Sequence, residues 1–161
     1  MWQGSEQLWM PASPETVWSI ITDVERHPQL AGSGEVRAVR PDGPLKVGAT
    51  WEADEHIKGP AGSFTARSEV ITFEPPRVFA WRSYPPELRK GNPDSVADVT
   101  WTFILTPERD GTNVEHSYRV VEPKVGAAML KTFYFISRRP NTIRKGMRKT
   151  LANIRASATT G

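Results

Sequence analysis

Apolar and polar residues alternate through most of the chain between residues 35 and 121. Segments 50–58, 64–73, 78–84, 99–105 and 112–121 carry large apolar side chains mainly at every second position. This period is typical of β-strands with one buried face. Asp110-Gly111 and other turns rich in glycine and proline separate the segments. The pattern therefore predicts a run of antiparallel strands that pair with their neighbours along the chain.

The N-terminal part predicts one strand followed by two short helices. Residues 6–10 form the strand. Ser13-Pro14-Glu15 then combines an N-cap hydroxyl, a proline and an acidic first turn, which together indicate a helix start. Asp23 can cap a second short helix, and His27-Pro28 limits its length.

The C-terminal part predicts a long helix with one apolar stripe. The helix covers residues 127–136 and 141–158, with an interruption at Pro140. The stripe recurs at helical spacing and consists of Ile143, Met147, Leu151, Ile154 and Ala158. Because this helix follows a run of strands, its stripe must be buried against the sheet, which predicts an α+β fold. If the sheet curves round the helix, a hollow remains between them, and we expect the function there.

The positive charge of the chain is concentrated at its C-terminal end. The formal net charge is +3, yet residues 123–161 hold nine Lys and Arg and no Asp or Glu. One interpretation is a solvated outer face of the last helix. The other is contact with an anionic surface through residues 138–155. We favour the solvated face and expect no nucleic acid, because interleaved exposed aromatic residues are missing.

Several kinds of chemistry lack the residues they need. The chain has no cysteine, which excludes disulfides, thiolate catalysis and cysteine metal sites. Its three histidines are 29 and 60 residues apart, a spacing that matches no metal-ligand pattern. Glycine-rich phosphate loops and a G-x-S-x-G elbow are also missing. We see no signal peptide and no membrane span, so we expect a cytoplasmic protein without metal or cofactor.

Short motifs follow one another along nearly the whole chain. They are Pro14-x-x-x-Trp18 with Asp23 and His27-Pro28, Val47-Gly48-x-x-Trp51, Val70-x-x-Phe73-x-Pro75-Pro76-Arg77-x-Phe79-x-Trp81, Gly111-Thr112-x-Val114 and Met147-x-x-x-Leu151. In this order they resemble the START-like superfamily, also called SRPBCC, and within it the polyketide cyclase/dehydrase-like group. The resemblance implies one helix-grip domain over residues 1–161. In that fold a curved seven-stranded antiparallel sheet wraps round the long C-terminal helix, with an apolar cavity between them.

Members of this superfamily bind lipids, hormones or polyketides, and some catalyse cyclisation or dehydration. Because fold alone does not decide between these functions, the chemistry must be argued from side chains. His116 and Tyr118 are the candidate catalytic residues, since they share the predicted inward face of Val114 and Val120. A cavity histidine with a near-neutral pKa can shuttle protons, and a tyrosine can donate to a developing enolate oxygen. The alternatives are that both only satisfy buried hydrogen bonds, or that they contact a ligand without chemistry.

Further residues are predicted to contact a ligand. Glu55 shares a face with Trp51 and Ile57, where an inward carboxyl would have a raised pKa, but we expect it at the water-exposed rim. Ser83 ends an inward run, whereas Arg67 has the outward parity. The predicted ligand-binding set is Trp51, Glu55, Trp81, Ser83, Trp101, Phe103, Met129, Phe133 and Thr150.

Two features of the C-terminal region bear on the cavity. A stripe of small residues either lets a ligand approach the helix or permits close packing to the sheet, and comprises Gly146, Thr150, Asn153 and Ser157. Three apolar residues are expected to close the cavity mouth together with the loop 85–95, namely Met129, Phe133 and Ile136.

The leading hypothesis is a protein that binds a small, largely apolar ligand, polyketide- or lipid-like, in an internal cavity. If it is an enzyme, His116 is the proton shuttle and Tyr118 the oxyanion donor of a cyclase or dehydratase. The alternatives are a carrier or sensor without chemistry, a protein that contacts anionic surfaces through its basic helix, and a chaperone-associated module of the same fold. Ligand identity and oligomeric state do not follow from the sequence.

Overall fold

The structure is a computed structural model that describes residues 2–59, 62–84, 97–121, 123, 126–136 and 138–160, without the side chains of residues 129, 130, 133 and 134. Its elements are β1 (Gln3–Met10), α1 (Pro14–Ile21), the 3₁₀ turn η1 (Val24–Arg26), α2 (His27–Leu30), β2 (Val36–Pro41), β3 (Thr50–Ile57), β4 (Gly62–Glu74), β5 (Val78–Tyr84), β6 (Asp98–Glu108), β7 (Gly111–Val121), α4 (Ala127–Ile136) and α5 (Arg139–Thr159). The predicted order of elements is confirmed, although β1 begins at Gln3 rather than Glu6.

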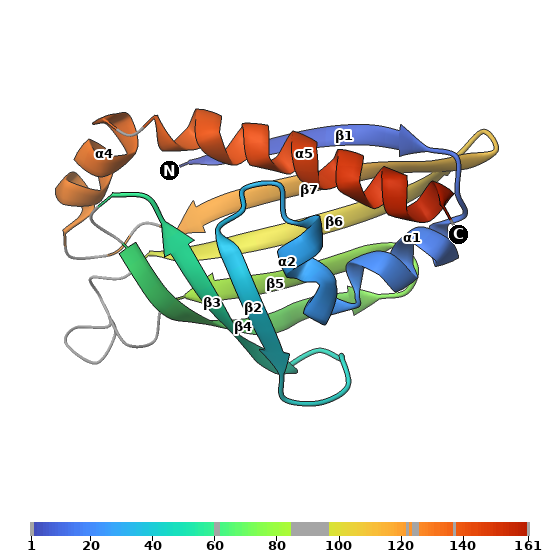
Figure 1. Cartoon of the computed structure of the whole chain (residues 1–161), viewed down its shortest axis with the longest axis horizontal. Coiled ribbons are helices and arrows are strands. Elements are labelled where there is room, and N and C mark those ends of the chain that lie inside the picture. Colours follow the sequence, from blue (N-terminus) through green and yellow to red (C-terminus); the bar gives the residue numbers. More distant parts are fainter. Residues whose placement is uncertain are drawn as a thin grey trace.

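The strands form one antiparallel seven-stranded sheet in the order β1-β7-β6-β5-β4-β3-β2. The long β6–β7 hairpin pairs without a register shift from Asp98 opposite Val121 to Glu108 opposite Gly111. Its turn comes one residue earlier than the Asp110-Gly111 signal suggests, and Arg109 has a φ of 56° there. Bulges in the β2–β3 and β4–β5 ladders bend the sheet. Figure 1 shows the curved sheet with α5 lying along β1 and β7, which confirms the predicted helix-grip fold.

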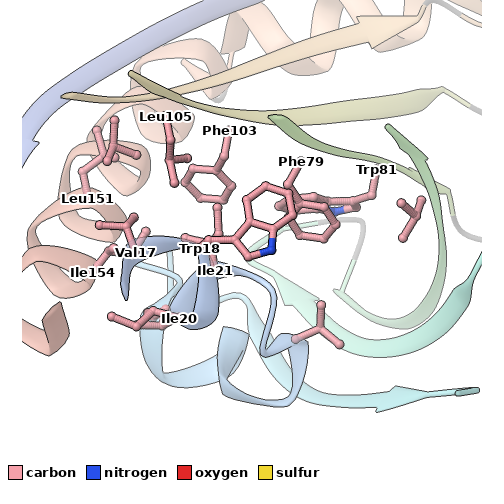
Figure 2. Close-up of a cluster of buried hydrophobic side chains, with 14 of the residues drawn as sticks. Val17, Trp18, Ile20, Ile21, Phe79, Trp81, Phe103, Leu105, Leu151 and Ile154 are labelled. Carbon is pink, nitrogen blue, oxygen red and sulfur yellow. The ribbon is translucent and has the colours of Figure 1, made fainter. Parts of the chain in front are cut away.

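α1 fills one end of the space between the sheet and α5. Ser13 caps the helix, since its Oγ accepts a hydrogen bond from the Thr16 N–H at 3.2 Å. Figure 2 shows Val17 and Trp18 of α1 among apolar side chains of the sheet and of α5. The labelled partners from those elements are Phe79, Trp81, Phe103, Leu105, Leu151 and Ile154. This end of the interior is therefore solid hydrophobic core.

α5 packs its predicted apolar stripe inward. Ile143, Met147, Leu151 and Ile154 are buried. Pro140 lies in the first turn of α5, where a proline is tolerated, so it starts this helix rather than interrupting a longer one. Arg138 precedes it with a left-handed backbone, φ 50°, and separates α4 from α5. No helix in the described part of the chain is long and apolar enough to span a membrane.

The small-residue stripe of α5 lies against the segment that follows α2. Gly32 donates its N–H to the Thr150 hydroxyl at 2.9 Å, and that hydroxyl donates to the Gly146 carbonyl at 2.9 Å. Asn153 donates its side-chain amide to the Leu30 carbonyl at 3.0 Å. The small-residue stripe therefore permits close packing, which was one of the two predicted roles. It packs against the segment around Leu30 and Gly32, however, and not against the sheet.

Candidate ligand-binding site

The interior between α5 and the sheet differs at its two ends. At the α1 end, Phe79, Leu105 and Val114 are at most 2% exposed. At the opposite end, where α4 lies in Figure 1, the inward-facing Ser83 and Trp101 remain partly exposed. The α4 end is therefore the less tightly packed end of this interior in the described part of the chain.

Four aromatic residues that were predicted as cavity walls do face inward and touch one another. Trp81 and Trp101 are direct cross-strand partners on β5 and β6. The rings of Trp51 and Trp81 have centroids 5.9 Å apart, and those of Trp81 and Phe103 are 6.0 Å apart. This series of rings leads from the solid core toward the partly open end. Whether the rings also touch a ligand stays a prediction.

His116 lies deep in this interior and is only 5% exposed. Its ring stacks on Phe103 at 4.0 Å and on Trp101 at 5.6 Å, and its Nδ1–H donates to the Thr102 carbonyl at 3.2 Å. Burial is the main cause that lowers the pKa of His116 to about 4; the hydrogen bond to Thr102 opposes this shift, and the charge of His27 adds to it. The near-neutral pKa expected from the sequence is therefore wrong, because a charged ring here would lose its water.

Tyr118 is the second predicted catalytic residue and is also buried on the inward face of β7. A side chain on Gly4 would lie 3.0 Å from the Tyr118 ring, so glycine leaves room for the phenol. Burial raises the pKa of Tyr118, while Arg144 and Arg139 oppose that shift, and the hydroxyl stays protonated at neutral pH. It has no hydrogen-bond partner within the described part of the chain.

Glu55 forms the polar centre of the partly open end, with Glu35 and Arg139 as its charged neighbours. Glu35 pairs with Arg139 through two hydrogen bonds, of which Nη2 to Oε2 measures 2.8 Å. The pKa of Glu55 is raised to about 7, mainly by burial and in part by the negative charge of Glu35, while Arg139 opposes the shift. The carboxyl accepts no hydrogen bond from any described residue. β3 keeps its alternation, so Glu55 lies on the face of Trp51 and Ala53, yet it is only half-buried and lines a surface hollow. Its expected place at the rim of the sheet therefore stays a prediction.

Ser83 is the only other predicted hydroxyl on the inward face of the described strands. The Ser68 hydroxyl donates to the Ser83 hydroxyl at 3.2 Å, which leaves the Ser83 proton able to reach a ligand. Thr150 lies elsewhere, since its hydroxyl is engaged with Gly32 and Gly146. Arg67 points outward as expected and pairs with Asp42 at 3.3 Å.

The predicted mouth residues have mixed outcomes. Ile136 is 75% exposed and points into solvent, so the prediction that it closes the cavity is wrong. The side chains of Met129 and Phe133, and the loop 85–95, lie outside the described residues. A hollow of about 340 Å³ reaches Glu55 and Phe64 at this end, but its other lining residues belong to the outer face. The enclosed apolar cavity stays a prediction.

Sequence reasoning missed three residues of this site. Glu35 and Arg139 are 104 positions apart and meet only because β2 and the start of α5 lie at the same end of the fold. His27 was used only as a motif residue, yet its ring lies 5.4 Å from Trp81 and its Nε2–H donates to the Ile21 carbonyl. The only sequence feature that could have drawn attention to Arg139 is its position directly before Pro140, which marks the start of a helix.

The curved seven-stranded sheet and the packing of α5 along it define a helix-grip protein. The chain belongs to the family described as polyketide cyclase / dehydrase and lipid transport, whose model matches residues 1–158. The fold-family resemblance noted from the motifs is thereby confirmed. No curated protein sequence matches the chain.

Solved structures share this fold at low sequence identity. Protein CV1439 from Chromobacterium violaceum is 12% identical, covers 99% of both chains and has a TM-score of 0.67. The hypothetical protein jhp0584 from Helicobacter pylori is 14% identical over 97% of this chain and 87% of its own, with a TM-score of 0.70. StfQ, a di-domain ARO/CYC from the steffimycin biosynthetic pathway, is 13% identical over 97% of this chain and 50% of its own, with a TM-score of 0.64. At these identities the likeness establishes the fold alone.

Proposed function

We propose that the protein binds a small, largely apolar ligand, polyketide- or lipid-like, between α5 and the concave face of the sheet at the α4 end. The observation that carries the proposal is a pair of inward polar groups with no hydrogen-bond partner within the described part of the chain, the Glu55 carboxyl and the Tyr118 hydroxyl. A ligand oxygen or a water molecule can supply the hydrogen bond that each group lacks there. Their position beside the aromatic walls suits a ligand with an apolar body and oxygen substituents.

The chemistry of Glu55 and Tyr118 limits the class of ligand that fits the site. With a pKa of about 7, Glu55 is partly protonated at neutral pH and can donate to a ligand carbonyl or accept from a ligand hydroxyl. Tyr118 keeps its proton and can donate to a second oxygen. Flat rings stack well on Trp101 and Trp81, which favours a polycyclic aromatic or conjugated ligand over a saturated chain. The membership of the family supports the same class of ligand.

The experiment introduces a bulky side chain into the proposed site and measures how strongly a ligand still binds. Ser83→Phe adds a ring on the inward face beside Val99, and Thr100→Phe adds the same ring on the outward face as a matched control. Quenching of tryptophan fluorescence by a hydroxyanthraquinone reports binding, with palmitate as competitor. We expect Ser83→Phe to weaken binding about tenfold or more by steric exclusion, and Thr100→Phe to leave it within about twofold. Equal affinity in both variants would place the ligand elsewhere.

A second candidate function, ring closure or dehydration of such a ligand, is favoured by the raised pKa of Glu55. Aldol cyclisation begins when a base removes a proton from carbon beside a carbonyl, and the resulting enolate oxygen needs a donor. The enolate carbon then bonds to a second carbonyl carbon, whose oxygen takes up a proton. Glu55 supplies the base and acid, and Tyr118 supplies the donor. In this proposal Glu55 takes the proton transfer predicted for His116, because His116 is too weak a base.

Turnover of a poly-β-ketone mimic separates this candidate from a carrier or sensor. Glu55→Gln should abolish product formation while the mimic still binds, and His116→Phe should leave the rate within about threefold. The rate should follow deprotonation of a group with a pKa of about 7. A mimic that the wild-type protein binds and returns unchanged after long incubation would identify a carrier.

A further inference from the structure

The end of α4 exposes two adjacent large apolar side chains. Phe135 is 85% exposed and Ile136 is 75% exposed, more than any other large hydrophobic residue of the described chain. The next is Val47 at 62%, a single residue in the β2–β3 loop. Exposing two neighbouring apolar side chains of this size to water is unfavourable, and an exposed apolar patch often marks a binding surface.

Cationic residues frame this apolar pair. A hollow of about 850 Å³ beside it is lined by Trp2, Lys131, Phe135, Ile136, Arg138, Pro140 and Asn141. We call Trp2, Lys131, Phe135, Ile136 and Arg138 the α4 tip. Figure 1 shows the N-terminus of β1 and the start of α5 next to one another at this end of the molecule.

The charge beyond the α4 tip has the same sign. No acidic residue follows Glu122 in the sequence, and the acids that reach α5 come from other elements. Glu6 pairs with Arg144 and Arg148, each at or below 3.1 Å. Arg138, Lys145 and Lys149 are exposed and make no ion pair within the described part of the chain. A positive field therefore extends from the tip along the first half of α5.

We propose that the α4 tip docks on the surface of an anionic phospholipid bilayer. Phe135 and Ile136 enter the boundary between headgroups and acyl chains, where apolar side chains gain from leaving water. Arg138 and Lys131 lie at the level of the phosphates, and the Trp2 indole suits the same interface. Docking turns the partly open end of the interior toward the membrane, so a lipid-soluble ligand meets the site directly. The proposal holds whether or not the interior catalyses a reaction.

The observations fit other partners less well. A second copy of this chain joined tip to tip would bring Lys131 and Arg138 close to the same cations of its mate, which is unfavourable. A nucleic acid would use the cations but would leave the aliphatic side chain of Ile136 in water.

The experiment is co-sedimentation of the full chain with vesicles of phosphatidylcholine mixed with phosphatidylglycerol. We expect binding to these vesicles, much weaker binding to pure phosphatidylcholine, and loss of binding as salt rises. Phe135→Glu/Ile136→Glu should reduce the partition coefficient about tenfold or more, whereas Val47→Glu should reduce it less than about twofold. Lys131→Gln/Arg138→Gln should weaken the salt dependence, and Arg155→Gln near the other end of α5 serves as its charge control.

Each variant is expected to fold, because all the changed side chains are exposed or at the surface. Far-UV circular dichroism and thermal melting check this. A blue shift of Trp2 emission on vesicle addition, absent in Trp2→Phe, gives a second readout of the same contact. Failure of the wild-type protein to bind the anionic vesicles overturns the proposal. Unchanged vesicle binding by Phe135→Glu/Ile136→Glu overturns it too. So does a wild-type protein that forms a dimer and binds no vesicles, if this double variant dissociates the dimer.

Discussion

The ring of His116 lies face to face on the ring of Phe103, with centroids 4.0 Å apart and 8° between the planes. The two residues are directly opposite on β7 and β6, so the sheet register fixes this stack. An apolar ring on one face and Trp101 on the other remove the water that a charged imidazole needs. His116 is therefore a neutral part of the interior wall at physiological pH.

The first prediction follows from the lowered pKa of His116. The unfolded state takes up a proton near pH 6.5 and the folded state only near pH 4, so acid favours unfolding across that window. Folded-state stability from this group is complete above pH 6.5 and falls by up to about 3 kcal/mol as the pH approaches 4. His116→Phe keeps an aromatic ring and removes this loss. Urea unfolding at several pH values should show the variant gaining stability over wild type as the pH falls, and a pH-independent difference would contradict the assignment.

The second prediction concerns Glu55, whose pKa shift has the opposite consequence. Its folded-state pKa of about 7 lies above the ordinary 4.5, so the folded protein holds a proton that the unfolded chain releases. Stability from this group is present below pH 4.5 and lost as the pH rises to 7. Glu55→Gln should therefore be more stable than wild type at pH 8 by about 1–3 kcal/mol, and similar near pH 4.5.

Carbon-detected NMR of the glutamate carboxyl groups measures the same pKa directly. Glu35→Gln removes the like charge and should lower the pKa of Glu55, whereas Arg139→Met removes the opposing cation and should raise it. A Glu55 carboxyl that titrates near 4.5 in the wild-type protein would refute both this prediction and the base assignment.

The fold was predictable because its signals are local. Alternation in Val99–Leu105 marks β6, and the spacing of Ile143, Met147 and Leu151 marks α5, whatever the rest of the chain does. The same alternation correctly placed His116 and Tyr118 on the inward face. It did not give the protonation state of either, because that depends on the rings and charges that the sheet register brings opposite them.

The polar part of the candidate site depended on long-range contacts. Glu55 was assigned to the rim because flanking polar residues suggested a bulge in β3, while the bulge lies in the β2 ladder at Val36/Ala38. Arg139 and Glu35 carry no sequence pattern that pairs them across 104 positions. Such a contact follows from the assembled fold, and only a structure reveals it.

The third prediction tests the ion pair of Glu35 and Arg139. Their side chains are 21% and 13% exposed, so removing one leaves the other poorly solvated. Arg139→Met should lower the free energy of unfolding by about 1–3 kcal/mol, and adding Glu35→Gln should recover most of that loss. A double-mutant cycle measures the coupling, and additive effects would mean that the pair contributes nothing to stability.

The fourth prediction tests how α5 is held against the α2–β2 segment. A Cβ on Gly32 would lie 2.7 Å from the Thr150 backbone nitrogen and would also collide with Gly146 and Lys149. Gly32→Ala should cost about 2–3 kcal/mol of stability, because the backbones on both sides must separate. The neighbouring exposed Ser33→Ala should cost much less. Equal melting temperatures for the two variants would show that α5 does not pack closely here.

Ligand binding at the α4 end of the interior is tested most directly by NMR of the tryptophan indole N–H groups during titration with a hydroxyanthraquinone. The Trp9 indole donates to the Glu108 carbonyl at 2.9 Å, remote from the proposed site, and serves as an internal reference. We predict that the Trp101 and Trp81 signals shift with saturation while the Trp9 signal stays in place. Saturable binding that leaves Trp101 unmoved would contradict the proposed site.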